Sequence, residues 1–432
     1  MNFLRDAYRF GLGAALRLVF HRDFKPRGIG PLLKLRRVVP RVGGRQGLLP
    51  GAVRRVNRLL DSAELVDVVL TLHWGGGSKA YLDRKLAKMG SREAAVVLEP
   101  WLCPQALLGR LYVGGALREE FMVESLSSLV SLKGKCRRLL VNHLLQWNEY
   151  ASGNQISVVD FECIISQILD LRTALETKLV YLVHDYFCIC PRYVLIGPEG
   201  VYCQSEVSAA SCESCLANPA FRPIDLANDL RIKEWRRAFV RLIEAADQVR
   251  VFSQDAQRRI LSVFPNARCQ LVAHEAVTEI PRRPRVGRSP LVIGVIGTIS
   301  EEKGSRQVLA LARYLDDIGE KTTRIVVIGR LLADGAEIPS RITVSGEYKP
   351  EDLVDLVESS GVNLAFFSSV CPETFSYVTQ ELMMMDLPIA CYGFGAPAER
   401  VAKYEKGIII PRMTPESAWR AVRTLAERMG LG

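Results

Sequence analysis

The sequence predicts two doubly wound α/β domains that follow a basic N-terminal segment. From residue 65 onward, short apolar runs alternate with stretches of helical periodicity, which is typical of parallel sheets covered by helices. The alternation begins again at Leu291, after a stretch between Glu279 and Pro290 that is rich in proline and arginine and therefore indicates a linker. We expect the two α/β units to face each other across a cleft.

A chain of 432 residues is long enough for two or three domains with ample core. The composition, with 48% hydrophobic residues, excludes a disordered protein, and no apolar run reaches the roughly 20 residues that a transmembrane helix needs. We expect four parts, which are a basic arm at 1–64, an N-terminal domain at 65–285, a C-terminal domain at 286–412 and a final helix that packs back at 413–432.

The net charge of +10 is concentrated in residues 1–60, where 14 Lys and Arg accompany 2 Asp and Glu. This arm is interpreted either as an anchor on anionic lipid or as a basic segment packed on the body of the protein. Nucleic-acid binding lacks support, because basic and aromatic residues do not interleave. The N-terminus does not resemble a signal peptide, so we expect a cytoplasmic protein, either free or peripheral on the inner face of the cytoplasmic membrane.

The N-terminal unit opens with a strand, a glycine run and a helix. Leu65–Leu72 reads as a buried strand, and Gly75, Gly76 and Gly77 follow it, which would let a ligand approach the backbone closely. Helices are expected at Lys79–Met89, Phe121–Ser131, Phe161–Ala174 and 225–247. Further strands are expected at Ala94–Leu98, Cys136–Asn142, Lys178–Val183, Gln248–Ser253 and Gln270–Ala273.

His184 and Asp185 directly follow the expected strand at Lys178–Val183. Ligands bind at the carboxyl ends of parallel strands, so these two residues are placed for function, although a structural histidine capping a strand fits too. Four cysteines come next and could hold a structural zinc ion, namely Cys190, Cys203, Cys212 and Cys215. Free buried thiols or a redox pair are the alternatives.

The C-terminal unit carries a pair of glutamates around a loop and a helix. The segment Phe366–Ala398 reads as strand, loop, helix, strand and glycine turn, with Glu373 before the helix and Glu381 one to two turns into it. A helix amino end between them suits a phosphate group. Lys303, followed by Gly304, lies in the loop after the first strand of this unit.

These motifs resemble those of retaining GT-B glycosyltransferases of the large group-4-like family. The resemblance rests on Gly297, Lys303-Gly304, the run from Pro372 to Tyr377, Glu381 and the turn from Gly395 to Arg400. The N-terminal half, with its glycine run, His184-Asp185-Tyr186 and cysteines, is similar to bacterial transferases that assemble O-antigen and related surface polysaccharides.

The resemblance implies a role for each matching residue. Glu381 would bond the ribose hydroxyls of the nucleotide, Glu373 would lie beside the transferred sugar, and Lys303 would neutralise the diphosphate. His184 would lie near the reacting sugar, and the loop of Gly75, Gly76 and Gly77 would admit phosphate and acceptor. The remaining donor contacts would come from Gly297, Thr374, Phe375 and Ser376.

The resemblance thus implies a hexosyltransferase that moves a sugar from a nucleotide-sugar donor to a lipid-linked or saccharide acceptor. The absence of an Asp-x-Asp triplet favours a reaction without metal or other cofactor. One departure stands out, because Thr298 occupies the position where relatives carry an arginine that clamps the phosphates. A catalytically impaired scaffold and a nucleotide-sugar epimerase of the same fold are the alternatives.

Overall fold

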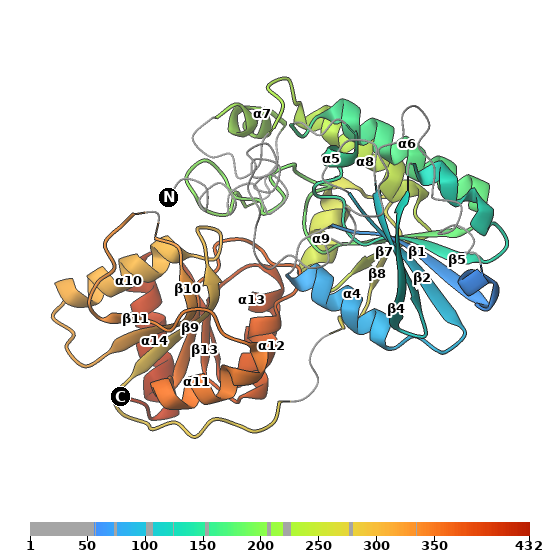
Figure 1. The fold of residues 1–432 in the computed structure, drawn as a ribbon. Coiled ribbons are helices and arrows are strands. Elements are labelled where there is room, and N and C mark those ends of the chain that lie inside the picture. The colour runs from blue at the N-terminus through green and yellow to red at the C-terminus, as the bar shows by residue number, and fades with distance from the viewer. Residues whose placement is uncertain are drawn as a thin grey trace, which may run out of the picture.

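The computed structural model describes residue 56 and residues 58–432, except residues 73–75, 101–106, 124, 152–154, 205–208, 219–225, 276–279 and 334. Two α/β units follow one another along the chain, each built on its own sheet (Figure 1). The prediction of two doubly wound α/β domains is therefore confirmed. Most of the expected basic arm, residues 1–55, lies outside the described residues.

The N-terminal sheet has eight strands in the order β4-β3-β2-β1-β5-β6-β7-β8. β3 and β4 run antiparallel at one edge, and the other strands are parallel. The strands are β1 (Leu65–Leu70), β2 (Glu93–Pro100), β3 (Leu107–Val113), β4 (Ala116–Val123), β5 (Cys136–Val141), β6 (Lys178–Leu182), β7 (Gln248–Val251) and β8 (Cys269–Leu271). The central strands are mostly apolar because helices cover both of their faces, with Asp67 in β1 and Arg137 and Arg138 in β5 as exceptions.

The edge hairpin of β3 and β4 was not expected, and the predicted helix at Phe121–Ser131 is wrong. Phe121 belongs to β4, and a short 3-10 helix, η1, follows at Leu126–Leu132. Gly114 and Gly115 form the turn, both with positive φ, which is the geometry that tight hairpins of this kind require. The hairpin thus adds two antiparallel strands to one edge of an otherwise parallel sheet.

Helices cover the two faces of this sheet unequally. α5, α6 and α8 lie on one face and α4 lies on the other (Figure 1). The helices are α4 (Gly77–Ala87), α5 (Asn148–Ala151), α6 (Val158–Leu175), α7 (Ala209–Ala217), α8 (Ile232–Ala245) and α9 (Gln254–Val263). The helix predicted at 225–247 corresponds to α8, which begins only at Ile232, after the capping residue Arg231.

The C-terminal sheet has six parallel strands in the order β11-β10-β9-β12-β13-β14. They are β9 (Val292–Ile299), β10 (Arg324–Leu331), β11 (Ile342–Val344), β12 (Leu364–Phe367), β13 (Ile389–Tyr392) and β14 (Gly407–Ile410). The helices are α10 (Ser305–Asp317), α11 (Leu353–Ser360), preceded by the 3-10 turn η2 (Pro350–Asp352), α12 (Tyr377–Met384), α13 (Gly395–Val401) and α14 (Pro415–Met429).

The final helix, α14, packs against α10 and against β12, β13 and β14 of the C-terminal unit. Its apolar face includes Trp419, Val422 and Leu425, which join the core on one side of the six-stranded sheet. None of the helices in the described part of the chain combines the length and apolar character needed to cross a bilayer.

Asn363 fastens the linker between the two units to the C-terminal sheet. Its buried side-chain oxygen accepts a hydrogen bond from the amide of Val292 at 2.9 Å. Its side-chain nitrogen donates to the carbonyl oxygens of Gly287 at 3.0 Å and Pro290 at 2.9 Å. One amide therefore satisfies three backbone groups at the entrance to β9.

Replacing Asn363 with alanine should lower the free energy of unfolding by about 1–3 kcal/mol, because three backbone groups, of which the amide of Val292 is buried, lose their partner. Urea denaturation followed by circular dichroism measures the change. Asn266→Ala is the matched control, since the side chain of Asn266 makes an exposed bond to Glu244. Equal midpoints for the two variants would show that Asn363 does not hold the linker.

Candidate functional site

The candidate site begins at the carboxyl edge of the C-terminal sheet. From β9 the chain moves outward through β10 and β11 and then returns to β12 on the other side of β9. Ligands of open parallel sheets bind beside such a reversal of strand order. Lys303 lies in the loop after β9 and Glu373 in the loop after β12, so the topology itself brings the two residues together.

The two loops meet in an ion pair. Lys303 Nζ donates to Glu373 Oε1 at 2.6 Å, and the hydroxyl of Ser368 donates to the carbonyl oxygen of Lys303 at 2.7 Å. Gly304 is required for this approach, because a Cβ atom at Gly304 would lie 1.9 Å from the carbonyl oxygen of Ser368. Burial acts to lower the pKa of Lys303, but the Glu373 carboxylate outweighs it and raises that pKa, so Lys303 is charged.

The loop that carries Glu373 is held from behind by the start of α13. The amide of Ala396 donates to the carbonyl oxygen of Glu373 at 2.8 Å. Gly395 has a φ of +74°, and a Cβ there would lie 2.8 Å from the Glu373 nitrogen. The glycine turn in the motif is therefore the support that fixes the position of the glutamate.

Helix α12 starts at Tyr377, and the Ser376 side chain caps it by accepting from the amide of Thr379 at 3.2 Å. Glu381 is the fifth residue of this helix, as the spacing predicted. Burial raises the pKa of Glu381 to about 6, and the positive charge of Arg84 opposes that effect. A small change of environment, such as a bound ligand, would therefore decide whether Glu381 is ionised near neutral pH.

His184 lies on the N-terminal side of the interface between the two units. Its Nε2 atom is 3.0 Å from Oδ1 of Asn142, and its carbonyl oxygen accepts from the Thr374 hydroxyl at 2.8 Å. Burial lowers the pKa of His184 well below its usual value, and the nearby His143 and His274 add to that effect. A neutral His184 is thus held against the loop that carries Glu373.

An aromatic stack joins the two units next to Glu373. The rings of His274 and Phe375 are nearly parallel, with centroids 3.9 Å apart. Tyr377 meets the His274 ring edge-on, and Arg84 lies 4.7 Å from the centroid of the Tyr377 ring. The hydroxyl of Tyr377 donates to the carbonyl oxygen of Glu275 at 3.2 Å, so α12 is tied to the segment that leaves the N-terminal sheet.

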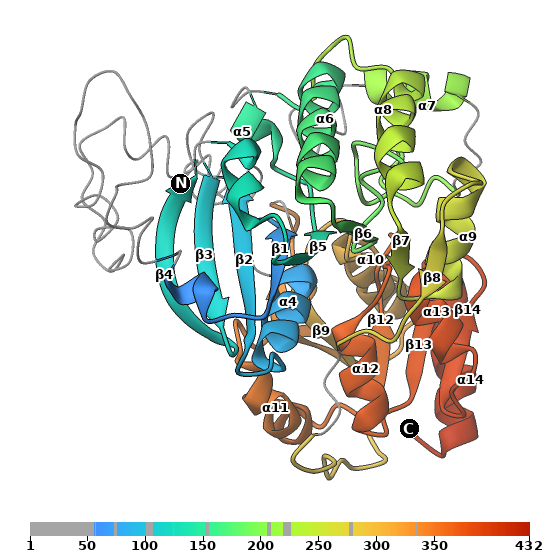
Figure 2. The same ribbon diagram turned by 90° about the vertical axis from the view of Figure 1, so that its right-hand side faces the viewer.

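The predicted glycine positions are divided between the two units. Gly76 caps α4 with a φ of +96°, and Gly77 begins that helix. The Tyr377 hydroxyl reaches the carbonyl oxygen of Gly77 at 3.4 Å, so the start of α4 lies against α12 (Figure 2). Gly75 lies outside the described residues. Gly297, near the end of β9, has open space where a side chain would stand.

Three polar residues at this interface were not singled out from the sequence. Arg84 comes from α4, and Asn142 and His143 follow β5. His143 Nε2 lies 2.8 Å from Oδ2 of Asp185, and the Asn142 side chain donates to Thr71 at 3.0 Å. Asn142 and His143 carried a usable signal, because Asn142 ends an expected strand and His143 directly follows it, as His184 follows another.

Thr298 occupies the position where the family resemblance leads us to expect a phosphate-binding arginine, and another arginine lies beside it. Thr298 on β9 is paired in register with Arg330 on β10. Arg330 forms an ion pair with Glu347 at 3.0 Å. Arg306, by contrast, lies on the exposed side of α10, where it pairs with Glu301 at 2.6 Å. The sheet thus places an arginine on the strand next to Thr298.

The predicted zinc site finds no support. Among the described residues, no group of three or more His, Cys, Asp or Glu side chains is arranged to hold a metal ion. The four cysteines are nonetheless neighbours. Burial is the main cause that raises the pKa of the Cys190 thiol to about 12, and the charges of Cys203, Cys212 and Cys215 add to it.

Comparison with known proteins identifies the C-terminal unit. Residues 277–429 match the family model of the glycosyl transferases group 1. The C-terminal unit is therefore similar to the glycosyl transferases group 1 over its whole length. The match spans the linker and all of the C-terminal strands and helices described above, which contain Lys303, Glu373 and Glu381. No curated protein sequence matches the chain.

Solved structures show that the chain has a known two-domain fold. Alr3699/HepE from Anabaena, in complex with UDP-glucose, has a TM-score of 0.52 at 13% identity, over 85% of this chain and 91% of that protein. The complex of the same protein with UDP has a TM-score of 0.52 at 12% identity, over 84% and 90% of the two chains. Its complex with UDP and glucose has a TM-score of 0.51 at 13% identity, with the same coverage.

The stacked histidine should make the stability of the protein depend on pH. Burial, aided by Arg84, lowers the pKa of His274 to about 3 in the folded state, against about 6.5 in the unfolded state. The neutral ring is therefore favoured by folding, so its contribution is complete above pH 6.5 and declines as the pH falls from there toward 3. The loss should reach at most about 2 kcal/mol at pH 5.

His274→Phe should remove this part of the pH dependence, because phenylalanine can keep the stack on Phe375 without titrating. Thermal unfolding of both proteins between pH 7.5 and pH 5 measures it. A variant whose unfolding temperature falls as steeply with pH as that of the wild type would exclude His274 as the titrating group.

Proposed function

We propose that the protein transfers a sugar from a nucleotide-sugar donor to a lipid-linked or saccharide acceptor in the assembly of a surface polysaccharide such as O-antigen. The reaction retains the anomeric configuration and needs no metal ion, as the family resemblance implies. The observation that carries the proposal is the meeting of Lys303, Glu373 and the amino end of α12 at the switch point of the C-terminal sheet.

Departure of the diphosphate is the first demand of this chemistry. Lys303 is charged and lies at the carboxyl edge of the sheet, and the amino end of α12 adds the positive end of a helix dipole. Both groups are fixed by their loops before the donor arrives, so they stabilise the developing negative charge without rearranging. Arg330, next to Thr298, is the candidate for a second phosphate contact.

Glu373 serves the sugar in this proposal. Without donor, its carboxylate is paired with Lys303. A bound diphosphate would replace the carboxylate as the partner of Lys303 and leave Glu373 to accept hydrogen bonds from the sugar hydroxyls. His184, whose carbonyl oxygen is bonded to Thr374, would lie on the opposite side of the sugar. The loop of Gly75, Gly76 and Gly77 would admit the phosphate and the acceptor.

Glu381 binds the ribose in this proposal. Two ribose hydroxyls are donors, so the carboxylate must be ionised to accept from both of them. Phe375, Ser376 and Gly297 complete the donor contacts. The acceptor would be brought to the inner face of the cytoplasmic membrane by the basic segment of residues 1–60.

Titration calorimetry with UDP-, GDP- and dTDP-sugars tests the proposal directly. UDP-glucose is the first ligand to test, since Alr3699/HepE has a structure with it. Binding of one donor with a dissociation constant below about 1 mM supports the proposal. Failure of all three donor classes to bind would refute the transferase function and leave the impaired scaffold.

Lys303→Gln should lower kcat/KM for the bound donor at least about 100-fold, because the leaving diphosphate loses a charge that is fixed in place. Steady-state transfer from the donor found by calorimetry measures the effect. Arg306→Gln is the matched control, because Arg306 is an exposed cation three residues away that pairs with Glu301. Equal rates for Lys303→Gln and the control would refute the role of Lys303.

Glu381→Gln should weaken nucleotide binding by about 1–3 kcal/mol, the usual range for a hydrogen bond to a charged group. Affinity of the wild type should also fall as the pH drops through about 6, where Glu381 becomes protonated. The variant should lose this pH dependence, and calorimetry at pH 5 and pH 7.5 measures both effects. Glu351→Gln, on the exposed turn η2, is the control. A wild-type affinity independent of pH would contradict the ribose role.

A further inference from the structure

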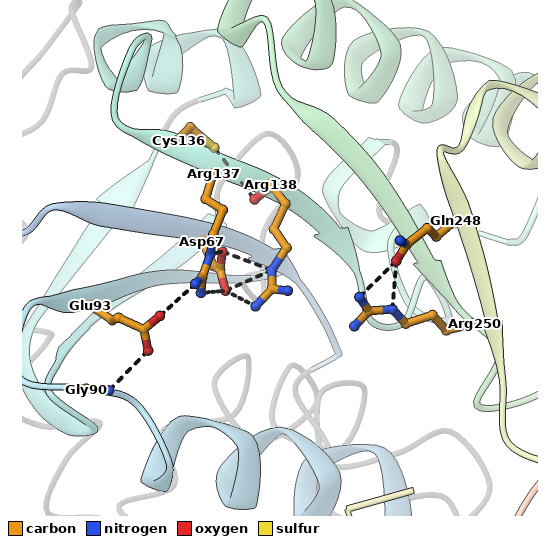
Figure 3. A network of polar contacts seen from close by, with 8 residues as sticks. All are labelled: Asp67, Gly90, Glu93, Cys136, Arg137, Arg138, Gln248 and Arg250. Carbon is orange, nitrogen blue, oxygen red and sulfur yellow. Dashed lines mark hydrogen bonds and ion pairs between the residues drawn. The ribbon is translucent and has the colours of Figure 1, made fainter. Parts of the chain in front are cut away.

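The face of the N-terminal sheet under α4 carries an unusual concentration of charge. Asp67 on β1, Arg138 on β5 and Arg250 on β7 all lie on this face (Figure 3). Lys85 of α4 lies close to these three charges. Asp67 is buried. A sheet face covered by a helix is normally apolar, so these side chains need a specific explanation.

The carboxylates on this face are already engaged. Asp67 accepts from Arg137 at 2.9 Å and from Arg138 at 2.7 Å, and Glu93 accepts from Arg137 at 2.6 Å (Figure 3). Arg250 bonds the side chain of its neighbour Gln248 at 2.8 Å. The two carboxylates, Asp67 and Glu93, are thus already paired with the two arginines of β5.

Lys85 and Arg250 are cations in excess. Within the described part of the chain, neither forms an ion pair with a carboxylate. Burial lowers the pKa of Lys85, and the charges of Arg138 and Arg250 lower it further. Burial also lowers the pKa of Arg250, again with help from Arg138. Lys85, Arg138 and Arg250 therefore repel one another where they are partly buried. This repulsion lowers stability unless an anion binds between them.

There is room for such an anion. A cavity of about 190 Å³ lies between α4 and the sheet, and its lining includes Asp67, Lys85, Arg137 and Arg138. It is well above the volume that one water molecule needs and below the roughly 300 Å³ at which pockets for drug-sized ligands begin. The lining also includes Glu275, whose carboxylate is paired with Lys88 at 2.6 Å, so it does not neutralise Lys85 or Arg250.

We propose that this cavity binds a small phosphate group, held by Lys85, Arg137 and Arg138, with the charge of Arg250 close by. A phosphate dianion would match the excess of two positive charges and offers enough oxygens for an ammonium group and two guanidinium groups. The site is separate from the proposed donor site, because it is built on the N-terminal sheet, whereas Lys303 and Glu381 belong to the C-terminal unit.

Calorimetry with inorganic phosphate on the full chain tests the proposal, at constant ionic strength and with chloride as the reference anion. The protein should carry Lys303→Gln, so that phosphate binding at the donor site does not contribute. Phosphate should bind in this background, and adding Lys85→Gln should weaken it at least about tenfold, as should adding Arg250→Gln. Lys79→Gln is the control, because Lys79 lies on the same helix, exposed and paired with Asp83 at 2.5 Å.

Lys85→Gln and Arg250→Gln each remove one of the cations that repel one another, so both variants should fold. Their melting temperatures check this. Glycerol 3-phosphate and vesicles that contain phosphatidic acid distinguish a free phosphate ester from a lipid headgroup, and either one, if it depends on Lys85, supports the site. Phosphate that binds no better than chloride, or equally well with and without Lys85→Gln, would overturn the proposal. These results are independent of donor binding, which is measured in the protein with native Lys303.

Discussion

The ion pair between Lys303 and Glu373 is the contact on which the candidate site depends. It joins loops that follow two neighbouring strands, and both loops are fixed by glycines whose backbones touch the opposing chain at Gly304 and Gly395. Without donor, each charge compensates the other, so the free protein avoids the cost of two uncompensated charges at a partly buried site. A bound diphosphate would replace the Glu373 carboxylate as the anion beside Lys303. The exchange leaves the charge balance of the lysine unchanged while it frees the carboxylate for the sugar.

The same loop connects the two domains. Thr374 follows Glu373 and bonds the carbonyl oxygen of His184, and Phe375 stacks on His274. The residues that would hold the donor are therefore immediate neighbours of the residues that hold the domains together. Contacts of less than 4 Å therefore join this loop to the N-terminal unit. The low pKa of His274 belongs to this arrangement, because a protonated ring would be buried beside Arg84.

The sequence predicted where Lys303, Glu373 and Glu381 lie in the fold, because they belong to continuous motifs at strand ends, where topology decides position. Glu381 is five residues into a helix whose cap, Ser376, is a typical start signal. The hairpin of β3 and β4 was missed, although Gly114-Gly115 between two β-rich runs is a hairpin signal; the pattern around Phe121 was read as helical instead. Contacts such as Arg84 with Tyr377 could not be predicted, since they join segments almost 300 residues apart and depend on how the domains meet. The cysteine spacing suggested zinc, but spacing alone does not turn the thiols toward a common centre.

Charged residues inside two expected strands also have a structural reason. Asp67 of β1 stands opposite Arg138 of β5, and the register shifts between Val66 and Asp67. Adjacent residues of a regular strand point to opposite faces, so Arg137 and Arg138 could not both reach Asp67 without such an irregularity. With it, one buried carboxylate accepts from both arginines, and the two together lower its pKa although burial acts to raise it. A slip of β1 by one residue would bury the carboxylate without partners, so the pairing fixes the register of the central strands and, with it, the position of the loops that lead to the domain interface.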